Sequence, residues 1–516
     1  MARRHEASRL SPPSAPSFVA RLFSTLSIDA LRDESRPQHL RRALGARDLI
    51  AIGLGTMIGG GIFATIGVGV HLAGPAVILA FLLAGLTSFF AALCYAELGS
   101  IVPIAGSAYT YAYATLGQVV AWIIGFALLF EYGISAAPVA QTFSKYLQLV
   151  LQQRAGVVLP HWAQTSNFVI DPSAWWNVTR WDFVHSQGDV IGAVFVLLLS
   201  ALLAIGIRET ATTNNIFVVL KITALVVFVA FGVTLFHPAN LVPFIPQGWG
   251  SLQPFSGGGG SGVIPAAALV FFIYIGFDTA TTTAEETRNP KRDVPVGVIG
   301  ALAIGTVIYC VVAVVLVGTA PWQQISQDTP LANAVAPLHN GFVDAMIIIG
   351  VLAGTTSVAL ASLLGQTRIF YVMARDRMLP PFVAKIHPRF KTPALQTMIT
   401  GVGVAILTLI VPLTDLLNLV NIGTLAAFIV VCAGVIWLRY KRPDLPRPFR
   451  SPLVPWFPLT GILLSLILIV YGLNVRTLYW FLGALLVGLV IYFSYGYRMS
   501  RPEREVSYEL PESLLP

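Results

Sequence analysis

The feature that most constrains the fold is a series of mostly apolar stretches, each long enough to form a helix through a lipid bilayer. About 20 apolar residues are needed to cross a hydrocarbon layer roughly 30 Å thick. The 516-residue chain contains twelve such stretches, at 48–70, 76–97, 117–150, 188–206, 211–235, 262–283, 295–318, 342–372, 394–411, 414–438, 456–474 and 477–497. We therefore predict an all-α polytopic membrane protein with twelve transmembrane helices.

The composition excludes most other classes of protein. Apolar residues make up 56% of the chain and charged residues only 11%, whereas about a quarter of the residues in a soluble domain are charged. We expect the lipid bilayer as the surrounding partner and no nucleic acid. The sequence has no Gly-Lys pair for a phosphate-binding loop and no His-xxx-His or His-Glu-xx-His pair for a metal. We therefore expect no enzyme, cofactor or metal site.

The distribution of basic residues predicts the orientation of the chain. With twelve spans, 27 of the 32 Lys and Arg residues fall on the side that holds both termini, and only Arg154, Arg180 and Arg476 fall on the other side. Because cytoplasmic loops carry an excess of Lys and Arg, both termini are predicted to be cytoplasmic. A missed or invented span would exchange the sides of all later loops, so this bias also supports the count of twelve.

The residues before the first span form a basic arm, 1–47, that contains nine arginines. Within it, Phe18, Leu22 and Leu26 share one face of a predicted helix over 18–31. This segment is predicted either to lie on the inner membrane surface or to pack against the cytoplasmic loops.

The first span contains five glycines within nine residues, at Gly53, Gly55, Gly59, Gly60 and Gly61. Each glycine costs a helix about 1 kcal/mol relative to alanine. Close packing against another helix explains a single Gly-xxx-Gly pattern, but three consecutive glycines indicate a helix that is interrupted near Gly59 to Gly61. Free backbone groups at that depth require a cavity and a ligand.

The sixth span shows a parallel pattern, because Phe271–Asp278 is followed by a threonine-rich sequence that is too polar for a lipid-facing helix. Interrupted helices five spans apart indicate two inverted repeats with a substrate site at their junction. This division gives a cytoplasmic N-terminal arm 1–47, a first five-helix repeat 48–235, a second repeat 262–438, a peripheral helix pair 456–497 and a cytoplasmic C-terminal tail 498–516.

The helix dipoles at these interruptions predict the kind of substrate. A half-helix that begins after Gly61 presents open N–H groups to an anion, while half-helices that end near Ile58 and Ile275 present open carbonyl groups to a cation. An α-amino acid carries a carboxylate and an ammonium group close together and can use both ends. A sugar or a simple ion would use only part of this arrangement.

Two charged residues lie near the middle of predicted spans. Lys221 is about 4.5 Å from the centre of the fifth span, given a helical rise of 1.5 Å per residue. A lysine at this depth costs at least about 2.5 kcal/mol and is expected to be paired or deprotonated. We interpret Lys221 as a proton carrier rather than a permanent ion pair, with Glu131 in the third span as the candidate partner.

Asp278 follows the predicted interruption in the sixth span. Its carboxylate is expected either to attract a basic substrate side chain or to cap the half-helix that follows, and the sequence favours neither interpretation over the other.

Seven segments together resemble the bacterial cationic amino acid transporters of the amino acid–polyamine–organocation (APC) superfamily. They are Ser27–Leu31, Leu44–Leu49, Met57–Phe63, Tyr95–Leu98, Ala105–Tyr113, Phe271–Asp278 and Leu364–Tyr371, and the resemblance covers roughly residues 26–450. It implies the LeuT fold, two inverted five-helix repeats with two further helices, and alternating access around a central site. It also implies a bacterial plasma membrane protein.

The resemblance also implies roles for individual residues. The backbone at Gly59, Gly60 and Gly61 would bind the substrate carboxylate, and Phe272 would gate the pocket. Lys221 would occupy the place of a sodium ion in related transporters, with Glu131 as its acidic neighbour and the proton as coupling ion. The remaining substrate-binding residues would be Thr56, Met57, Ile58, Ile273, Ile275, Asp278, Thr355 and Thr356.

The activity expected from these patterns is proton-coupled symport of amino acids, either cationic or of a broad range. Two alternatives remain open on the same fold, an amino acid exchanger and a sensor that binds amino acids without transporting them. A small accessory membrane subunit is left open as a partner.

Overall fold

The computed structural model describes residues 18, 22–25, 44–101, 107–169, 182–206, 211–251, 253–255, 260–282, 284, 287–390 and 392–499. Most of the arm and the whole C-terminal tail after 499 lie outside the described residues. The predicted amphipathic helix over 18–31 therefore falls mainly outside them. Its described part contacts the protein, because Phe18 packs against Tyr497 with ring centroids 5.2 Å apart and Ser24 accepts a hydrogen bond from the backbone of Gln118.

Up to residue 260, the described part of the chain forms helices, short 3-10 turns and one short hairpin. The hairpin consists of β1 (Asn167–Val169) and β2 (Asp182–Gln187), which pair antiparallel. The helices are α3 (Ala46–Met57), α4 (Gly60–Ala73), α5 (Val77–Ile101), α6 (Ser107–Thr115), α7 (Gln118–Ala155), α8 (Val190–Ile205) and α9 (Ala211–Gly232).

The rest of the described chain is helical and is joined by short turns. Its helices are α10 (Val263–Val270), the 3-10 turn η6 (Phe271–Tyr274), α11 (Thr279–Thr282), α12 (Pro290–Thr319), α13 (Pro330–Val335), α14 (Gly341–Arg375), α15 (Ala394–Ile410), α16 (Leu413–Lys441), α17 (Trp456–Ile467), α18 (Val475–Ile491) and α19 (Tyr497–Met499). Two π-helical turns extend α17 and α18, at Leu468–Gly472 and Tyr492–Gly496.

Each of the twelve apolar stretches in the sequence coincides with one or more of these helices. Within the described ranges, eight helical segments are long and apolar enough to cross a membrane, and three shorter apolar helices accompany them, at Val190–Ile205, Ala394–Ile410 and Trp456–Gly472. One segment, Gly60–Ile101, is 42 residues long and contains a turn at Gly74, whose φ is 62°. The polytopic helical class is confirmed, and the count of twelve crossings stays a prediction.

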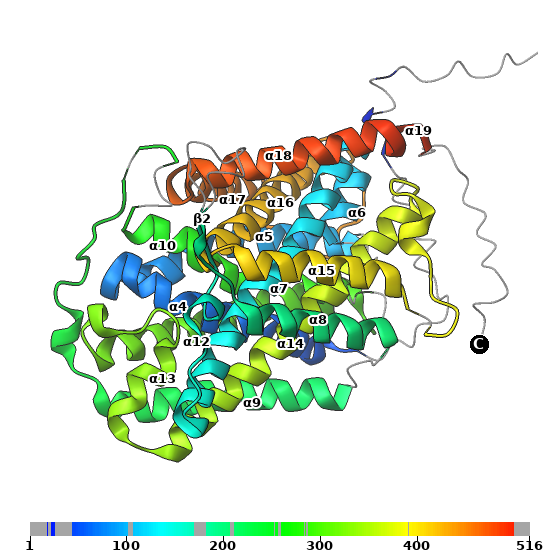
Figure 1. Ribbon diagram of the computed structural model, residues 1–516. Coiled ribbons are helices and arrows are strands. Elements are labelled where there is room, and N and C mark those ends of the chain that lie inside the picture. Colours follow the sequence, from blue (N-terminus) through cyan, green and yellow to red (C-terminus); the bar gives the residue numbers. More distant parts are fainter. Residues whose placement is uncertain are drawn as a thin grey trace, which may run out of the picture.

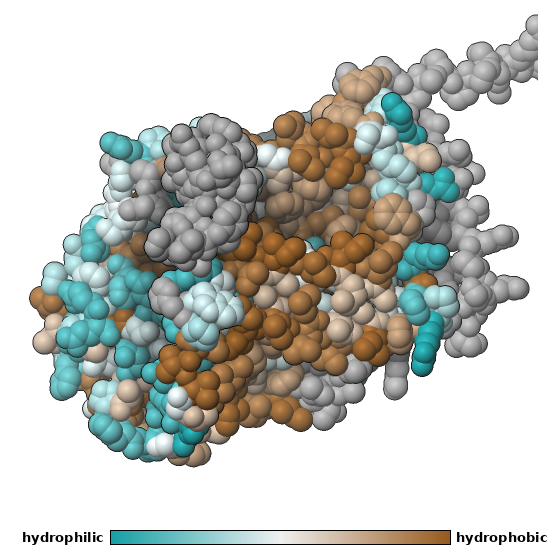
Figure 2. Space-filling model, viewed as in Figure 1, coloured by the Kyte–Doolittle hydropathy of each residue, from teal (hydrophilic) through white to brown (hydrophobic). Residues whose placement is uncertain are grey.

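The surface agrees with a membrane environment. Figure 2 shows apolar residues covering the middle of the visible face and polar residues gathered towards its two ends. Many large apolar side chains are exposed on the helices, such as Leu198, Val219 and Leu486, each at least 60% exposed. In water such a surface would be unfavourable, whereas lipid solvates it.

The interior is built from helices that are distant in sequence. Helix α14 packs against α7 and α9, and α12 packs against α5 and α3. Helix α4 contacts α10, α7 and α14, so the glycine-rich segment lies inside the bundle. The last long helix, α18, runs along one edge of the bundle (Figure 1) and contacts α16 and α7.

Candidate functional site

The first predicted interruption is confirmed. Helix α3 ends at Met57, and Ile58 has an extended backbone with φ −77° and ψ 120°. Gly59 follows with φ 141° and ψ −98°, and α4 begins at Gly60. A residue with a side chain rarely adopts that φ, so glycine is required at position 59.

The interruption leaves the start of α4 without a side-chain cap. Gly59 occupies the N-cap position and provides no side-chain hydrogen bond. The first N–H groups of a helix have no partner within the helix, and the dipole adds partial positive charge at this end. The N-terminus of α4 is therefore a place where a buried anion is stabilised.

The three glycines of the interruption also pack against other helices. A Cβ atom added to Gly59 would lie 2.6 Å from the carbonyl oxygen of Gly354, and one added to Gly60 would lie 2.4 Å from Val139. A Cβ on Gly61 would lie 2.6 Å from the Cα of Ile273. The two readings of the glycine cluster, helix interruption and close packing, therefore both hold.

The second predicted interruption is present as well. Helix α10 ends at Val270, and the backbone tightens into the 3-10 turn η6 up to Tyr274. Ile275 is extended, with φ −65° and ψ 132°, and Gly276 has φ 115°. The change from α-helix comes at Phe271, before the predicted end near Ile275, and it makes Phe272 and Ile273 part of the turn.

The two interruptions meet in the interior. Helix α4 packs against η6, and the hydroxyl of Thr56 on α3 donates to the carbonyl oxygen of Gly276 at 2.9 Å. The side chains of Met57, Ile58, Phe272 and Ile273 are all buried. The structure thus brings together the backbone segments Thr56–Gly61 and Phe272–Ile275 that the sequence assigns to substrate.

Thr355 and Thr356 lie on α14 beside the first interruption. Their hydroxyls donate to carbonyl oxygens of their own helix, Thr355 to Val351 at 2.8 Å and Thr356 to Leu352 at 2.7 Å. The preceding Gly354 is the residue that contacts Gly59. This part of α14 therefore forms one wall beside the N-terminus of α4.

Lys221 on α9 is fully buried. Its ammonium contacts the carbonyl oxygen of Gly55 on α3 and lies 3.1 Å from the hydroxyl oxygen of Ser357 on α14. Since α3 ends two residues later at Met57, the lysine connects the broken first helix to α14. Ser357 in turn donates to Gly354, so the lysine and the interruption share a neighbour.

The sequence predicted Glu131 on α7 as the partner of Lys221, but the structure does not place the two side chains together. Its carboxyl group lies near Asp278 and the hydroxyl of Thr424, whereas the ammonium of Lys221 contacts Gly55 and Ser357. The predicted pairing rested on depth in the membrane alone. The depth of a residue along a span does not determine which face of the helix it occupies, and the side chains of Lys221 and Glu131 face different neighbours.

Asp278 follows the second interruption and is buried. Its carboxylate accepts hydrogen bonds from Ser107 at 3.1 Å and Tyr132 at 3.4 Å. These donors come from α6 and α7, so the side chain connects the broken sixth span to two other helices.

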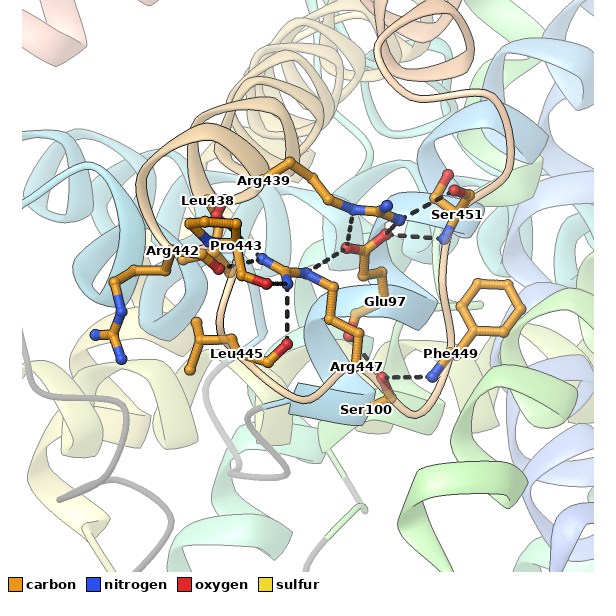
Figure 3. A network of polar contacts seen from close by, with 10 residues as sticks. All are labelled: Glu97, Ser100, Leu438, Arg439, Arg442, Pro443, Leu445, Arg447, Phe449 and Ser451. Atoms are coloured by element: carbon orange, nitrogen blue, oxygen red, sulfur yellow. Dashed lines mark hydrogen bonds and ion pairs between the residues drawn. The ribbon is translucent and has the colours of Figure 1, made fainter.

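A second polar centre, around Glu97 of α5, had no role assigned from sequence. Glu97 is 1% exposed, and its two oxygens accept from the guanidinium of Arg439 at 2.8 Å each. Arg447 lies 3.4 Å away and the backbone N–H of Ser451 donates at 2.8 Å. Figure 3 shows the carboxylate enclosed by these groups from α16 and the loop after it. Glu97 belongs to the segment Tyr95–Leu98 that carries part of the family resemblance. Its partners lie more than 340 residues away in sequence, so the sequence alone did not reveal them.

Comparison with known proteins decides the family. The sequence model of the amino acid permease family matches residues 44–496. The chain belongs to this family. As a permease of the APC superfamily, it is a transporter rather than an enzyme, and its helices are those of a multi-pass membrane protein.

Individual relatives of this permease differ in what their names say they transport. It is 40% identical to the branched-chain amino acid permease BcaP of Bacillus subtilis, over 92% of this chain and 97% of that protein. It is 38% identical to a methylthioribose transporter of the same organism, over 93% and 99%. It is 36% identical to the vacuolar cationic amino acid transporter 4 of Arabidopsis thaliana, over 79% and 65%.

Proposed function

We propose that this permease is a secondary transporter that moves α-amino acids across a bacterial plasma membrane by alternating access, on a LeuT-like fold of two inverted five-helix repeats. The observation that carries the proposal is the meeting of two interrupted helices, α3–α4 and α10–η6, inside the bundle. The excess of Lys and Arg on the side of the termini supports an orientation with both termini in the cytoplasm.

In this proposal the substrate binds to main-chain groups at the two interruptions. The N–H groups at Gly59, Gly60 and Gly61 bind the carboxylate, because they form the uncapped start of α4. Carbonyl groups around Thr56–Ile58 and Phe272–Ile275 bind the ammonium group, and Phe272 closes the site. The main-chain groups bind the carboxylate and the ammonium group, which all α-amino acids share. The preference among amino acids is therefore determined by the pocket around the substrate side chain.

The proposed side chains of the substrate come from the names of the relatives. The names of the relatives include branched-chain and cationic amino acids. Amino acids of both kinds carry a carboxylate for the open N–H groups and an ammonium group for the open carbonyl groups at the two interruptions. Methylthioribose, which the name of a third relative gives, has neither an ammonium nor a carboxylate group and is the second candidate substrate.

We propose that Lys221 couples transport to protons. When charged, its ammonium holds α3 to α14 through Gly55 and Ser357. A neutral amine donates more weakly than an ammonium, so loss of the proton would loosen this connection beside the substrate site. Protonation would thereby bias the position of the broken first helix, which is the element expected to move.

The test is uptake into proteoliposomes with and without a pH gradient, after a thermal-shift screen of the twenty amino acids selects the substrate. A proton symporter accumulates the substrate with the gradient, an exchanger requires internal amino acid, and a sensor does neither. Lys221→Met should abolish accumulation driven by the gradient. Lys441→Met, at an exposed lysine near the end of α16, is the matched control and should accumulate normally. Full accumulation by Lys221→Met would contradict the coupling role.

A further inference from the structure

A polar pocket lies one helical turn beyond the first interruption, on the side of the hairpin β1–β2. Its cavity volume is about 40 Å³, and it is partly open to solvent. It is lined by Ala64 of α4, Gln141 and Lys145 of α7, Ser166, Asp189 and Asp328. Ala64 is four residues after Gly60, and Gln141 is two residues after Val139, which packs on Gly60.

The charges in this pocket do not balance. Two carboxylates, of Asp189 and Asp328, face one ammonium, of Lys145. Lys145 lies 3.7 Å from Asp328, and the side chain of Asp328 is 58% exposed. The side chain of Lys145 is 19% exposed, so this ion pair lies at the edge of the buried part of the pocket. Asp189, by contrast, is fully buried, and it is the carboxylate that Lys145 does not contact within ion-pair distance.

Within the described part of the chain, two buried acceptor oxygens of the pocket have no hydrogen-bond partner, although the hydroxyl of the buried Ser144 lies beside the Asp189 carboxylate. Among the described residues, Oδ2 of Asp189 and Oε1 of Gln141 are buried without a hydrogen-bond partner. Oδ1 of Asp189 is used, because it accepts from the N–H of Gly192 at the start of α8. The amide nitrogen of Gln141 is used as well, on Ser166 and on two carbonyl groups of α15 and its C-terminal end.

Buried acceptors without donors are costly and are normally satisfied by a ligand or water. A carboxylate and an amide oxygen together suit a group that carries several N–H donors and a positive charge. A primary ammonium group has both properties. An anion would meet a surplus of negative charge in this pocket.

We propose that this pocket is an outer ammonium site, which binds the ammonium group of the incoming amino acid at Asp189 and Gln141 before the substrate reaches the two interruptions. The inference rests on the proposed amino acid transport. The ammonium of Lys145 pairs with Asp328 at 3.7 Å rather than with Asp189, which leaves Asp189 for the ammonium of the substrate. The orientation predicted from basic residues puts this site on the outer side.

The first test measures binding to the purified protein and does not depend on transport. The probe is isopentylamine, which is leucine without its carboxylate, and its binding is followed by calorimetric titration. Wild type should bind the amine, and Asp189→Asn should bind it at least tenfold more weakly. Asparagine retains the oxygen that accepts from Gly192, so the start of α8 is preserved. Asp344→Asn, a carboxylate at the start of α14 that does not line the pocket, should bind the amine as wild type does.

The second test separates the roles of the pocket and the central site. External isopentylamine should inhibit uptake competitively, and Asp189→Asn should raise KM for external substrate about tenfold while changing the maximal rate much less. An unchanged KM and unchanged amine sensitivity would overturn the outer ammonium site. So would a KM that depends on Na⁺ when sodium is replaced by N-methylglucamine, because the pocket would then bind an inorganic cation. Absence of any amino acid transport by wild type would overturn the proposed function, while the amine titration would still decide the site.

Discussion

The hydroxyl of Thr56 donates a hydrogen bond to the carbonyl oxygen of Gly276 at 2.9 Å, across 220 residues of sequence. Thr56 belongs to the last turn of α3, and Gly276 lies in the extended segment after η6. The hydroxyl of Thr279 also lies 3.1 Å from that of Thr56. Two helices that are each broken are therefore joined to each other at the breaks.

Replacing this hydroxyl tests the connection. Thr56→Val preserves the shape of the side chain and removes one hydrogen bond to the Gly276 carbonyl, which keeps the hydroxyl and N–H of Thr279 as donors. The loss should cost about 0.5–1.5 kcal/mol of stability. We expect a lower Tm and slower amino acid uptake. Thr87→Val is the matched control, since the hydroxyl of the buried Thr87 donates only within its own helix. Equal effects of the two substitutions would argue against a special connection at Thr56.

The packing at Gly60 predicts a steric effect that can be reversed. In Gly60→Ala the new Cβ would lie 2.4 Å from Val139 and 2.9 Å from Val358, and overpacking of this kind costs about 1–3 kcal/mol. Val139→Ala in the same protein should recover much of the lost stability, because it removes the nearer atom. The measurement is the Tm of the two single variants and the double variant.

The control for that series is Gly403→Ala in α15, where an added Cβ meets no atom within 4 Å. Alanine should leave Tm unchanged or raise it there, because it favours the helix. Additive losses in the double variant at positions 60 and 139 would contradict the proposed contact.

Much of this site follows from the sequence, since consecutive glycines in an apolar span conflict with a helix wherever the chain folds. The interruption at Gly59 was predictable for that reason, and the change after Val270 was predictable because the sequence after Asp278 is too polar for a lipid-facing helix. The face of a helix on which a charge lies depends on packing between distant helices. Lys221 and Glu131 were therefore predicted as partners, whereas their side chains lie beside different groups.

The polar centre at Glu97 predicts a large loss of stability when its charge is removed. Glu97→Gln leaves two arginines facing a neutral amide in a buried place, and breaking a buried ion pair costs about 3–5 kcal/mol. The measurement is the Tm or the midpoint of unfolding in denaturant. Arg442→Ala is the control, because it breaks a pair with Asp444 in which both side chains are largely exposed, and it should lower the stability much less. A comparable loss in the two variants would contradict the buried network.

The pH dependence of stability should differ between two carboxylates in the loops. Burial raises the pKa of Asp376, which accepts from Tyr109 at 2.8 Å and lies beside Arg375. The folded protein then binds its proton more tightly than the unfolded chain, so the contribution of Asp376 to stability falls as the pH rises from about 4 upward. Asp376→Asn should therefore gain in Tm relative to wild type as the pH rises above the ordinary aspartate pKa of about 4.

For Asp444, the contribution to stability should change with pH in the opposite direction. Hydrogen bonds from Arg442 lower the pKa of this exposed carboxyl group, so its contribution is present above the ordinary aspartate pKa and is lost as the pH falls. Asp444→Asn should therefore lose slightly in Tm at neutral pH and nothing at low pH. The same trend with pH in both variants would contradict the assignment for Asp376.

The most direct test of the account is whether transport requires both charged groups of the substrate. For the amino acid selected by the thermal-shift screen, uptake is compared with that of its analogues lacking the amine or the carboxylate, after subtraction of protein-free liposomes. For leucine these are 4-methylpentanoate and isopentylamine. Recognition by main-chain groups of the two broken helices predicts that kcat/KM falls at least tenfold for each analogue. Uptake of either analogue, or of methylthioribose, as efficiently as the amino acid would contradict it.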